Sequence, residues 1–304
     1  MVKEYLSNTT RDFLASCEKM PNSTETRIKF IQKDGWIGYE LAKKILDRVK
    51  EMVERPRNSR MHSLLVIGST DNGKTSIRKR IEEIYKRYPD DKGRVIWPVV
   101  SIQMPPNPTE LSFINAIIKG MLQPCYYGKP HMALEEAIEL LISHKVRLLM
   151  IDEVHHIIRL TPAKQRIIMD LIKFISNEAE LPFVAFGTEE ATNIFSYDPQ
   201  LKNRFKKMEI PRWQADSNFL RLMFSFISVL PLKQPSLLTT NPKAPDAADI
   251  ELAEAILDKT NGTIGEISMV IRNSAIVAIR DKEEKITKKI VLELEFESSE
   301  TPVM

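Results

Sequence analysis

The segment Gly68-Ser-Thr-Asp-Asn-Gly73-Lys74-Thr75 has the residue types and spacing of a phosphate-binding loop, GxxxxGK[ST]. Its glycines allow a tight turn in which successive backbone N–H groups point inward at phosphate oxygens. Lys74 is expected to reach the β- and γ-phosphates, and Thr75 to place its hydroxyl on Mg²⁺. The sequence therefore predicts a site for ATP and Mg²⁺. The predicted nucleotide-binding residues of this loop are Gly68, Ser69, Thr70, Asp71, Asn72, Gly73, Lys74, Thr75 and Ser76.

An acidic pair, Asp152 and Glu153, ends the apolar run that begins at Leu148. Acidic groups at the end of a buried strand cost desolvation free energy unless a cation lies beside them. Mg²⁺ is the natural partner, so Asp152 is predicted to hold the metal, directly or through water. Glu153 is predicted to orient and polarise the attacking water as the catalytic base. Alone, the pair would also fit a helix N-cap after a strand.

The combination of this acidic pair with the phosphate-binding loop indicates the ASCE branch of P-loop proteins, and within it the AAA+ layout. In that layout a polar residue after the fourth strand senses the γ-phosphate, and Thr188 is the candidate. Arg204 stands where AAA+ proteins present an arginine finger to the ATP of a neighbouring subunit. A helix cap for Thr188 and a solvated side chain for Arg204 stay open as alternatives. An arginine finger implies an oligomer.

Two further sets of residues lie near these motifs. Ile37 and Tyr39 stand where AAA+ proteins wrap the adenine, and they would equally suit the core of the first helix. His155 and His156 follow the acidic pair. Adjacent residues on a helix point in different directions, and no other ligand is spaced for a metal, so no zinc site is predicted.

These residues require a scaffold of alternating strands and helices. The predicted strands are 63–67, 95–102, 147–151, 182–186 and 207–211, with Pro98 weakening the second or placing it near an edge. The predicted helices are 37–53, 76–88, 110–121, 133–144 and 163–177, followed after Trp213 by 219–229, 249–259 and 264–280. The order predicts an α/β fold of the AAA+ type, a five-stranded parallel sheet flanked by helices, followed by a small helical lid.

The predicted domains are an N-terminal extension, 1–34, an α/β ATP-binding core, 35–214, a helical lid, 215–290, and a C-terminal tail, 291–304. The net charge of +3 is too small to indicate nucleic-acid binding by itself. Cys17 and Cys125 fit inert thiols in a reducing compartment. The absence of an apolar leader, and of any run of about 18 apolar residues, predicts a cytoplasmic protein without a membrane partner.

The whole pattern resembles the TniB/TnsC-like AAA+ regulators of DNA transposition, over roughly residues 35–280. The motifs that carry the resemblance are GSTDNGKT at 68–75, LLMIDEVHHI at 148–157, FVAFGTEEA at 183–191, DPQLKNRF at 198–205, LPLKQPSLL at 230–238 and TNGTIGEISMVIRNSAI at 260–276. One feature departs from many AAA+ proteins. Gly265 replaces the sensor arginine of the lid, as in TniB/TnsC-like proteins, which implies slow hydrolysis or reliance on Arg204.

The resemblance implies a bacterial protein that loads ATP and assembles on duplex DNA as rings or helical filaments. It also implies two protein partners, a transposase and a target-selecting protein of the TniQ type. In this family polar or basic side chains near the helix after the second strand touch the DNA backbone. The corresponding candidates here are Thr109, Lys119 and Lys129.

Two other functions stay open. An AAA+ loader or initiator in replication or repair would predict a winged-helix domain or a zinc insert, for which the roughly 90 residues after Trp213 leave little room. A nucleotide switch in signalling would bind ATP and hydrolyse it slowly. The intact Lys74, Asp152 and Glu153 argue against the switch.

Overall fold

The computed structural model describes residues 23–33, 35–57, 61–124, 128–197, 199–237 and 245–296. Cys17, Cys125, most of the predicted extension and the end of the predicted tail lie outside the described residues. The chain divides into two compact units. The sheet unit comprises Lys44–Thr70 and Lys74–Ile210, and the helical unit comprises Met1–Lys43, Asp71–Gly73 and Pro211–Met304.

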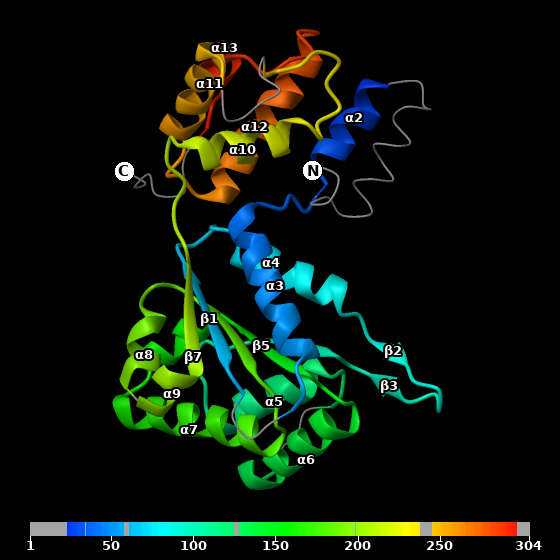
Figure 1. The fold of residues 1–304 in the computed structure, drawn as a ribbon, viewed down its shortest axis with the longest axis vertical. Helices are drawn as coiled ribbons and strands as arrows, with labels where there is room; N and C mark the ends of the chain where they lie inside the picture. The colour runs from blue at the N-terminus through cyan, green and yellow to red at the C-terminus, as the bar shows by residue number, and fades with distance from the viewer. Residues whose placement is uncertain are drawn as a thin grey trace. The chain divides into compact units, whose positions relative to one another are not determined.

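The sheet unit is built on a five-stranded parallel sheet with the strand order β4-β5-β6-β1-β7 (Figure 1). The strands are β1 (Ser63–Gly68), β4 (Val99–Gln103), β5 (Leu148–Asp152), β6 (Phe183–Gly187) and β7 (Phe205–Ile210). Every residue of β1, β5 and β6 is buried, as in parallel sheets that are covered on both faces. The predicted five-stranded parallel sheet is confirmed, and β6 separates the loop-bearing β1 from the acid-bearing β5.

Helices that precede or connect the strands accompany this sheet. They are α3 (Glu40–Glu54), α4 (Lys74–Ile84), α5 (Glu110–Gly120), α6 (Pro130–Ser143), the 3₁₀ helix η2 (Val154–Arg159), α7 (Pro162–Glu178), α8 (Ala191–Tyr197) and α9 (Pro199–Arg204). Helix α5 illustrates the packing, because its apolar residues Phe113, Ile114, Ile117 and Ile118 recur at steps of three and four and are all buried.

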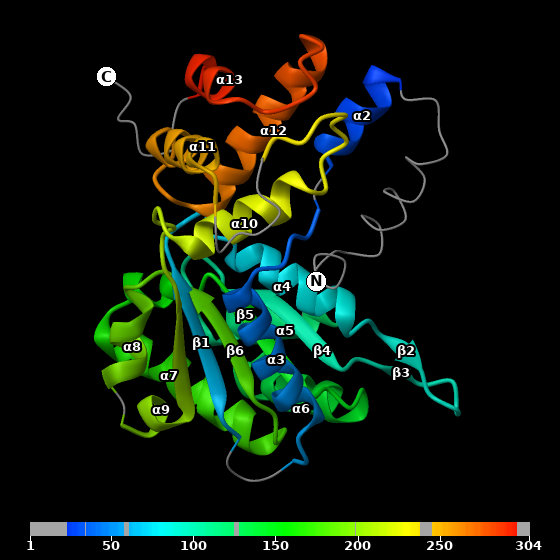
Figure 2. The same cartoon turned by 45° about the horizontal axis from the view of Figure 1, so that its top comes forward.

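A short antiparallel hairpin of β2 (Tyr88–Pro89) and β3 (Val95–Ile96) corrects two predictions (Figure 2). The predicted helix 76–88 ends earlier, at Ile84, and the predicted strand 95–102 is broken at Pro98. Asp90 forms the turn by accepting hydrogen bonds from the backbone N–H groups of Lys92 and Arg94. Proline has no N–H to donate, and the parallel pairing with β5 begins only after it, in the edge strand β4.

The helical unit contains α2 (Thr24–Ile31), α10 (Ser217–Ile227), α11 (Ala247–Asp258), α12 (Ile264–Arg280) and α13 (Lys288–Glu293). Helix α13 spans the predicted boundary at residue 290 between the helical lid and the C-terminal tail. Thr287 caps it by accepting a hydrogen bond from the N–H of Ile290, and the side chains of Ile290 and Val291 are buried. The burial of these two apolar side chains therefore fixes the short helix α13 to its neighbours.

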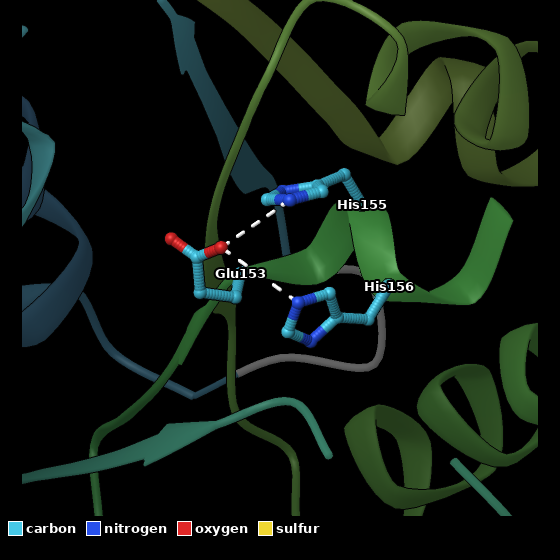
Figure 3. A group of neighbouring side chains, drawn as sticks. All are labelled: Glu153, His155 and His156. Atoms are coloured by element: carbon cyan, nitrogen blue, oxygen red, sulfur yellow. Dashed lines mark ion pairs between the residues drawn. The ribbon is translucent and has the colours of Figure 1, made fainter. Parts of the chain in front are cut away.

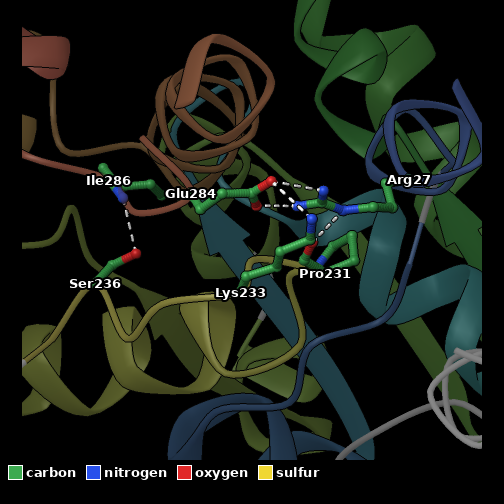
Figure 4. Close-up of polar contacts among 6 residues, drawn as sticks. All are labelled: Arg27, Pro231, Lys233, Ser236, Glu284 and Ile286. Atoms are coloured by element: carbon green, nitrogen blue, oxygen red, sulfur yellow. Dashed lines mark hydrogen bonds and ion pairs between the residues drawn. The ribbon is translucent and has the colours of Figure 1, made fainter. Parts of the chain in front are cut away.

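Arg27 ties α2 to the rest of the helical unit (Figure 4). Its guanidinium forms a two-pronged ion pair with the Glu284 carboxylate, and its Nε donates to the carbonyl of Pro231 at 2.7 Å. The bond from Arg27 holds the pKa of Glu284 below its usual value. Lys233 Nζ adds a second cation 3.6 Å from the same carboxylate.

Among the described residues, no helix is long and apolar enough to cross a membrane.

Candidate nucleotide site

The phosphate-binding loop joins the end of β1 at Gly68 to the start of α4 at Lys74. The side chain of Lys74 is buried, and its Nζ donates to the carbonyl oxygens of Gly68 (2.8 Å) and Ser69 (2.6 Å). The ammonium group therefore lies against the loop's own backbone. The first backbone N–H groups of α4, which include those of Thr75 and Ser76, have no partner within their helix and carry its positive dipole end. A phosphate is a natural ligand for such a helix start.

The middle of the loop, Asp71–Gly73, belongs to the helical unit. Asp71 and Gly73 both have positive φ, 58° and 83°. The buried side chain of Asn72 donates to the carbonyl of Pro211 at 3.0 Å and accepts from the N–H of Ile264 at 3.4 Å. These bonds fix the loop's backbone against the start of α12.

Gly265 explains why the lid lacks a sensor arginine. Its N–H donates to the Asp71 carbonyl at 3.0 Å. A Cβ added at Gly265 would lie 2.0 Å from Oδ2 and 2.1 Å from Cγ of Asp71. The Asp71 carboxylate thus occupies the space that any side chain at position 265 would need. The arginine further along α12, Arg272, is partly buried.

The two predicted adenine contacts also belong to the helical unit. Tyr39 is buried, and its ring packs edge-on against Trp213 with centroids 5.3 Å apart. Burial raises the pKa of its hydroxyl, which has no hydrogen-bond partner among the described residues. Ile37 is only partly buried. Tyr39 is thus a core residue of this unit, and contact with adenine stays a prediction for both side chains.

The acidic pair follows β5, and the buried Asp152 has both carboxylate oxygens engaged. Oδ1 accepts from the N–H of Glu153, and Oδ2 accepts from Nε of Arg78, each at 2.9 Å. Arg78 also bonds Glu82 and Ser101. Each carboxylate oxygen has two lone pairs, so Asp152 retains acceptor capacity for Mg²⁺ or its water, and the residue fits the metal. Thr75 is exposed at the start of α4, and its contact with the same ion stays a prediction.

Arg78 was not among the candidate site residues predicted from the sequence. Arg78 lies four residues after Lys74, and residues four apart share one face of a helix. That spacing is the signal that would have directed it toward the acidic pair.

Glu153 lies against two imidazoles (Figure 3), and this corrects the expectation that His155 and His156 diverge. Its Oε2 is 3.2 Å from Nε2 of His155 and 3.9 Å from Nε2 of His156. Two backbone features produce the convergence. Glu153 has the left-handed conformation with φ 56°, and the histidines lie in the tightly wound η2. Burial lowers the pKa of His155, and the Glu153 charge opposes that shift.

Thr188 follows β6, and its buried hydroxyl has no hydrogen-bond partner among the described residues. The alternative of a side-chain helix cap is therefore not realised, and a buried hydroxyl without a partner suits a group that awaits a ligand. Arg204 ends α9, and its Nη1 donates to Oδ1 of Asn177 at 2.8 Å. Its role as an arginine finger stays a prediction.

The three candidate DNA contacts are dispersed along two helices. Thr109 caps α5, where its hydroxyl accepts from the N–H of Ser112. Lys119 is exposed in the last turn of that helix, about 15 Å further along its axis at 1.5 Å per residue. Lys129 is exposed at the start of α6. The Thr109 hydroxyl therefore serves as a helix cap, whereas Lys119 and Lys129 are exposed cations.

Solved structures of ORC and Cdc6 proteins share this fold. The ORC2 protein of Aeropyrum pernix, in ADPNP and ADP complexes, has a TM-score of 0.54 at 14% identity, covering 83% of this chain and 65% of that one. Cdc6p of Pyrobaculum aerophilum has a TM-score of 0.53 at 15% identity, covering 84% of this chain and 67% of that one. The Aeropyrum pernix ORC1 protein in complex with DNA has a TM-score of 0.55 at 15% identity, covering 83% of this chain and 62% of that one. The chain spans about two thirds of the length of these ORC and Cdc6 proteins.

These likenesses establish the AAA+ P-loop fold, as predicted. No curated protein sequence matches the chain. The family model described as bacterial TniB protein matches residues 27–215, more than half of the chain.

Proposed function

Because the chain belongs to the bacterial TniB family, we propose that it is an ATP-dependent, DNA-binding AAA+ protein that oligomerises on duplex DNA. In this role it links the selection of a target site to a transposase. The observation that supports ATP use best is that Lys74 and Asp152 are both buried in the sheet unit, Lys74 at the start of the helix after the β1 loop and Asp152 at the carboxyl end of β5. Ligands of open α/β sheets bind at that edge.

The similar ORC structures support the nucleotide and the nucleic acid in this proposal. One is described with ADPNP and ADP, and two others are described as bound to DNA. The same fold is thus described with nucleotide in one structure and with DNA in others, and we infer nucleotide-dependent DNA binding for this chain. We also infer the remaining partners from the family resemblance: further copies of the chain, a transposase and a TniQ-type protein, in the bacterial cytoplasm.

In the proposed hydrolysis each residue has a distinct task. Lys74 exchanges its carbonyl partners for phosphate oxygens, and the N–H groups at the start of α4 bind the same phosphates. Asp152 and Thr75 would hold Mg²⁺, which would neutralise phosphate charge when bound. Glu153 accepts the proton of the attacking water, and the Thr188 hydroxyl contacts the γ-phosphate. Arg204 acts on the ATP of a neighbouring subunit.

Fluorescence anisotropy with labelled duplex DNA tests the proposal. Binding should require ATP or a non-hydrolysable analogue with Mg²⁺, and it should weaken steeply with salt, because backbone contacts release counterions. Lys74→Ala should lose nucleotide-dependent binding and ATP hydrolysis together. Lys79→Ala removes an exposed lysine from the same helix and should retain both. DNA affinity that is indifferent to nucleotide, in a chain that does not hydrolyse ATP, would contradict the proposal.

A second candidate is a loader or initiator in replication or repair, favoured by the fold shared with ORC and Cdc6 proteins. Identities of about 15% establish the fold alone. The two proposals differ in the partner. Pull-down of a transposase by the nucleotide-loaded, DNA-bound chain supports the first, and recruitment of a helicase or clamp supports the second.

A further inference from the structure

Three potential metal ligands converge at the start of η2: Glu153, His155 and His156 (Figure 3). One carboxylate oxygen and two imidazole nitrogens lie within 4.8 Å of one another. The side chains are partly buried, with exposed fractions of 32% for Glu153, 17% for His155 and 12% for His156. The proposed hydrolysis uses the carboxylate and assigns no task to either imidazole.

Hydrogen bonding fixes the protonation of His156. Its Nδ1 lies 3.0 Å from the carbonyl oxygen of Met104, and a carbonyl oxygen only accepts, so Nδ1 carries the proton. In the neutral ring Nε2 then presents a lone pair toward Oε2 of Glu153, 3.9 Å away. A lone pair that faces a carboxylate oxygen is favourable only when a cation or a proton lies between them.

The support behind His156 is rigid. Met104 follows the edge strand β4, and its own N–H donates to the carbonyl of Asp152 at 2.9 Å. The carbonyl that orients His156 is therefore held by the residue that precedes Glu153. Metal-binding histidines usually donate their second ring N–H to a backbone carbonyl or carboxylate, which sets the tautomer and the ring direction. His156 already has that partner.

We propose that Oε2 of Glu153 and Nε2 of both histidines form a binding site for a divalent transition-metal ion of the zinc class. Tetrahedral zinc has bonds of about 2.0 to 2.1 Å, which place neighbouring ligand atoms about 3.3 Å apart. The carboxylate oxygen is 3.2 Å from one nitrogen and 3.9 Å from the other, and all three atoms lie within 4.8 Å, so the side chains must move inward to reach that spacing. A water molecule completes the coordination. Mg²⁺ prefers an all-oxygen octahedral shell and does not compete well for two imidazoles.

The consequence rests on the proposed function, in which Glu153 is the catalytic base. A carboxylate oxygen bound to zinc no longer accepts a proton from the attacking water, so the occupied site blocks ATP hydrolysis. Lys74 and the start of α4 contribute no ligand to the site, so nucleotide binding persists. Zinc-class ions therefore hold the chain in its ATP-bound form.

Competition with a chromophoric zinc chelator measures the site directly, in nucleotide-free protein with excess Mg²⁺. One ion should bind per chain, and Co²⁺ should give the visible absorption of a tetrahedral complex. His155→Ala and His156→Ala should each weaken binding more than about 10-fold, since even outer-shell partners are worth about 10- to 100-fold. His62→Ala and His131→Ala remove exposed histidines outside the cluster and should bind normally. No binding, or equal binding in all four variants, would overturn the site.

Glu153→Gln serves as a second ligand variant that preserves shape, and it should also weaken zinc binding. ATP hydrolysis then tests the consequence, with each variant compared with its own metal-free rate. Zinc at a saturating free concentration should abolish ATP hydrolysis in the native chain. At the same zinc concentration, His156→Ala should retain most of its own metal-free rate of hydrolysis. Zinc that binds at the site without slowing hydrolysis overturns the inhibitory role. A chain that hydrolyses no ATP without zinc refutes the proposed function, and the binding measurement still decides the metal site.

Discussion

Substitution of Gly265 by alanine tests the contact between α12 and the phosphate-binding loop. The new Cβ would lie 2.0 to 2.2 Å from all three carboxyl atoms of Asp71, so this side chain must move. Overpacking of this kind costs about 1 to 3 kcal/mol. Alanine also gains about 1 kcal/mol over glycine within a helix. We therefore expect Gly265→Ala to destabilise the native chain by a net amount of about 0 to 2 kcal/mol.

The sign should reverse when Asp71 is replaced by glycine. That change removes the obstructing carboxyl group and suits the positive φ of 58° at this position. In the Asp71→Gly background, Gly265→Ala should stabilise the chain by up to about 1 kcal/mol. The coupling free energy between the two positions should be about 1 to 3 kcal/mol.

Thermal unfolding of the four chains in this double-mutant cycle provides the assay, with about 2 to 4 °C expected per kcal/mol. ATP affinity of each chain, measured in parallel, reports the conformation of the loop. Equal effects of Gly265→Ala in both backgrounds would refute the steric reasoning, as would a single variant more stable than the native chain with unchanged ATP affinity.

Three other predictions concern catalysis and acid stability. Glu153→Gln should slow ATP hydrolysis by about 10² to 10⁴ while ATP-dependent assembly on DNA persists or increases, measured by phosphate release and sedimentation; undiminished turnover would exclude Glu153 as the base. Arg204→Ala should lower hydrolysis by about 10³ and assembly with it, with Lys202→Ala as the neighbouring control; a normal rate would remove the finger assignment. Arg27 lowers the pKa of Glu284 below 4.5, so the stability from this pair is complete above that pH and is lost as the pH falls through the lowered value. Unfolding temperatures of Glu284→Gln should lack this acid-dependent loss, and an unchanged pH profile would show that the pair contributes little.

The features that local sequence predicts well are those that local chemistry dictates. The loop from Gly68 to Thr75 needs fixed residue types at fixed spacing to enclose a phosphate, so its identity is visible in the chain. The order of apolar runs and helical patterns similarly predicts the five-stranded parallel sheet, because parallel neighbours need crossover helices. Pro98 predicts the break before β4, since proline has no N–H to donate to a strand ladder.

Contacts between distant residues, or those created by an unusual backbone angle, escape such reasoning. Asp71 and Gly265 are far apart in the chain, and only the folded helical unit shows that one fills the space of the other's missing side chain. Glu153 meets His155 and His156 because its φ is positive, which no residue pattern indicates for a glutamate. Helix α13 depends on the burial of two side chains rather than on its own length.

The central claim is that ATP drives this chain to assemble on DNA. Electron microscopy with a non-hydrolysable ATP analogue and Mg²⁺, with and without duplex DNA, tests it most directly. We predict ordered rings or filaments threaded by DNA when the nucleotide is present, and their loss in Lys74→Ala. Monomers in both samples, with nucleotide bound, would contradict the claim.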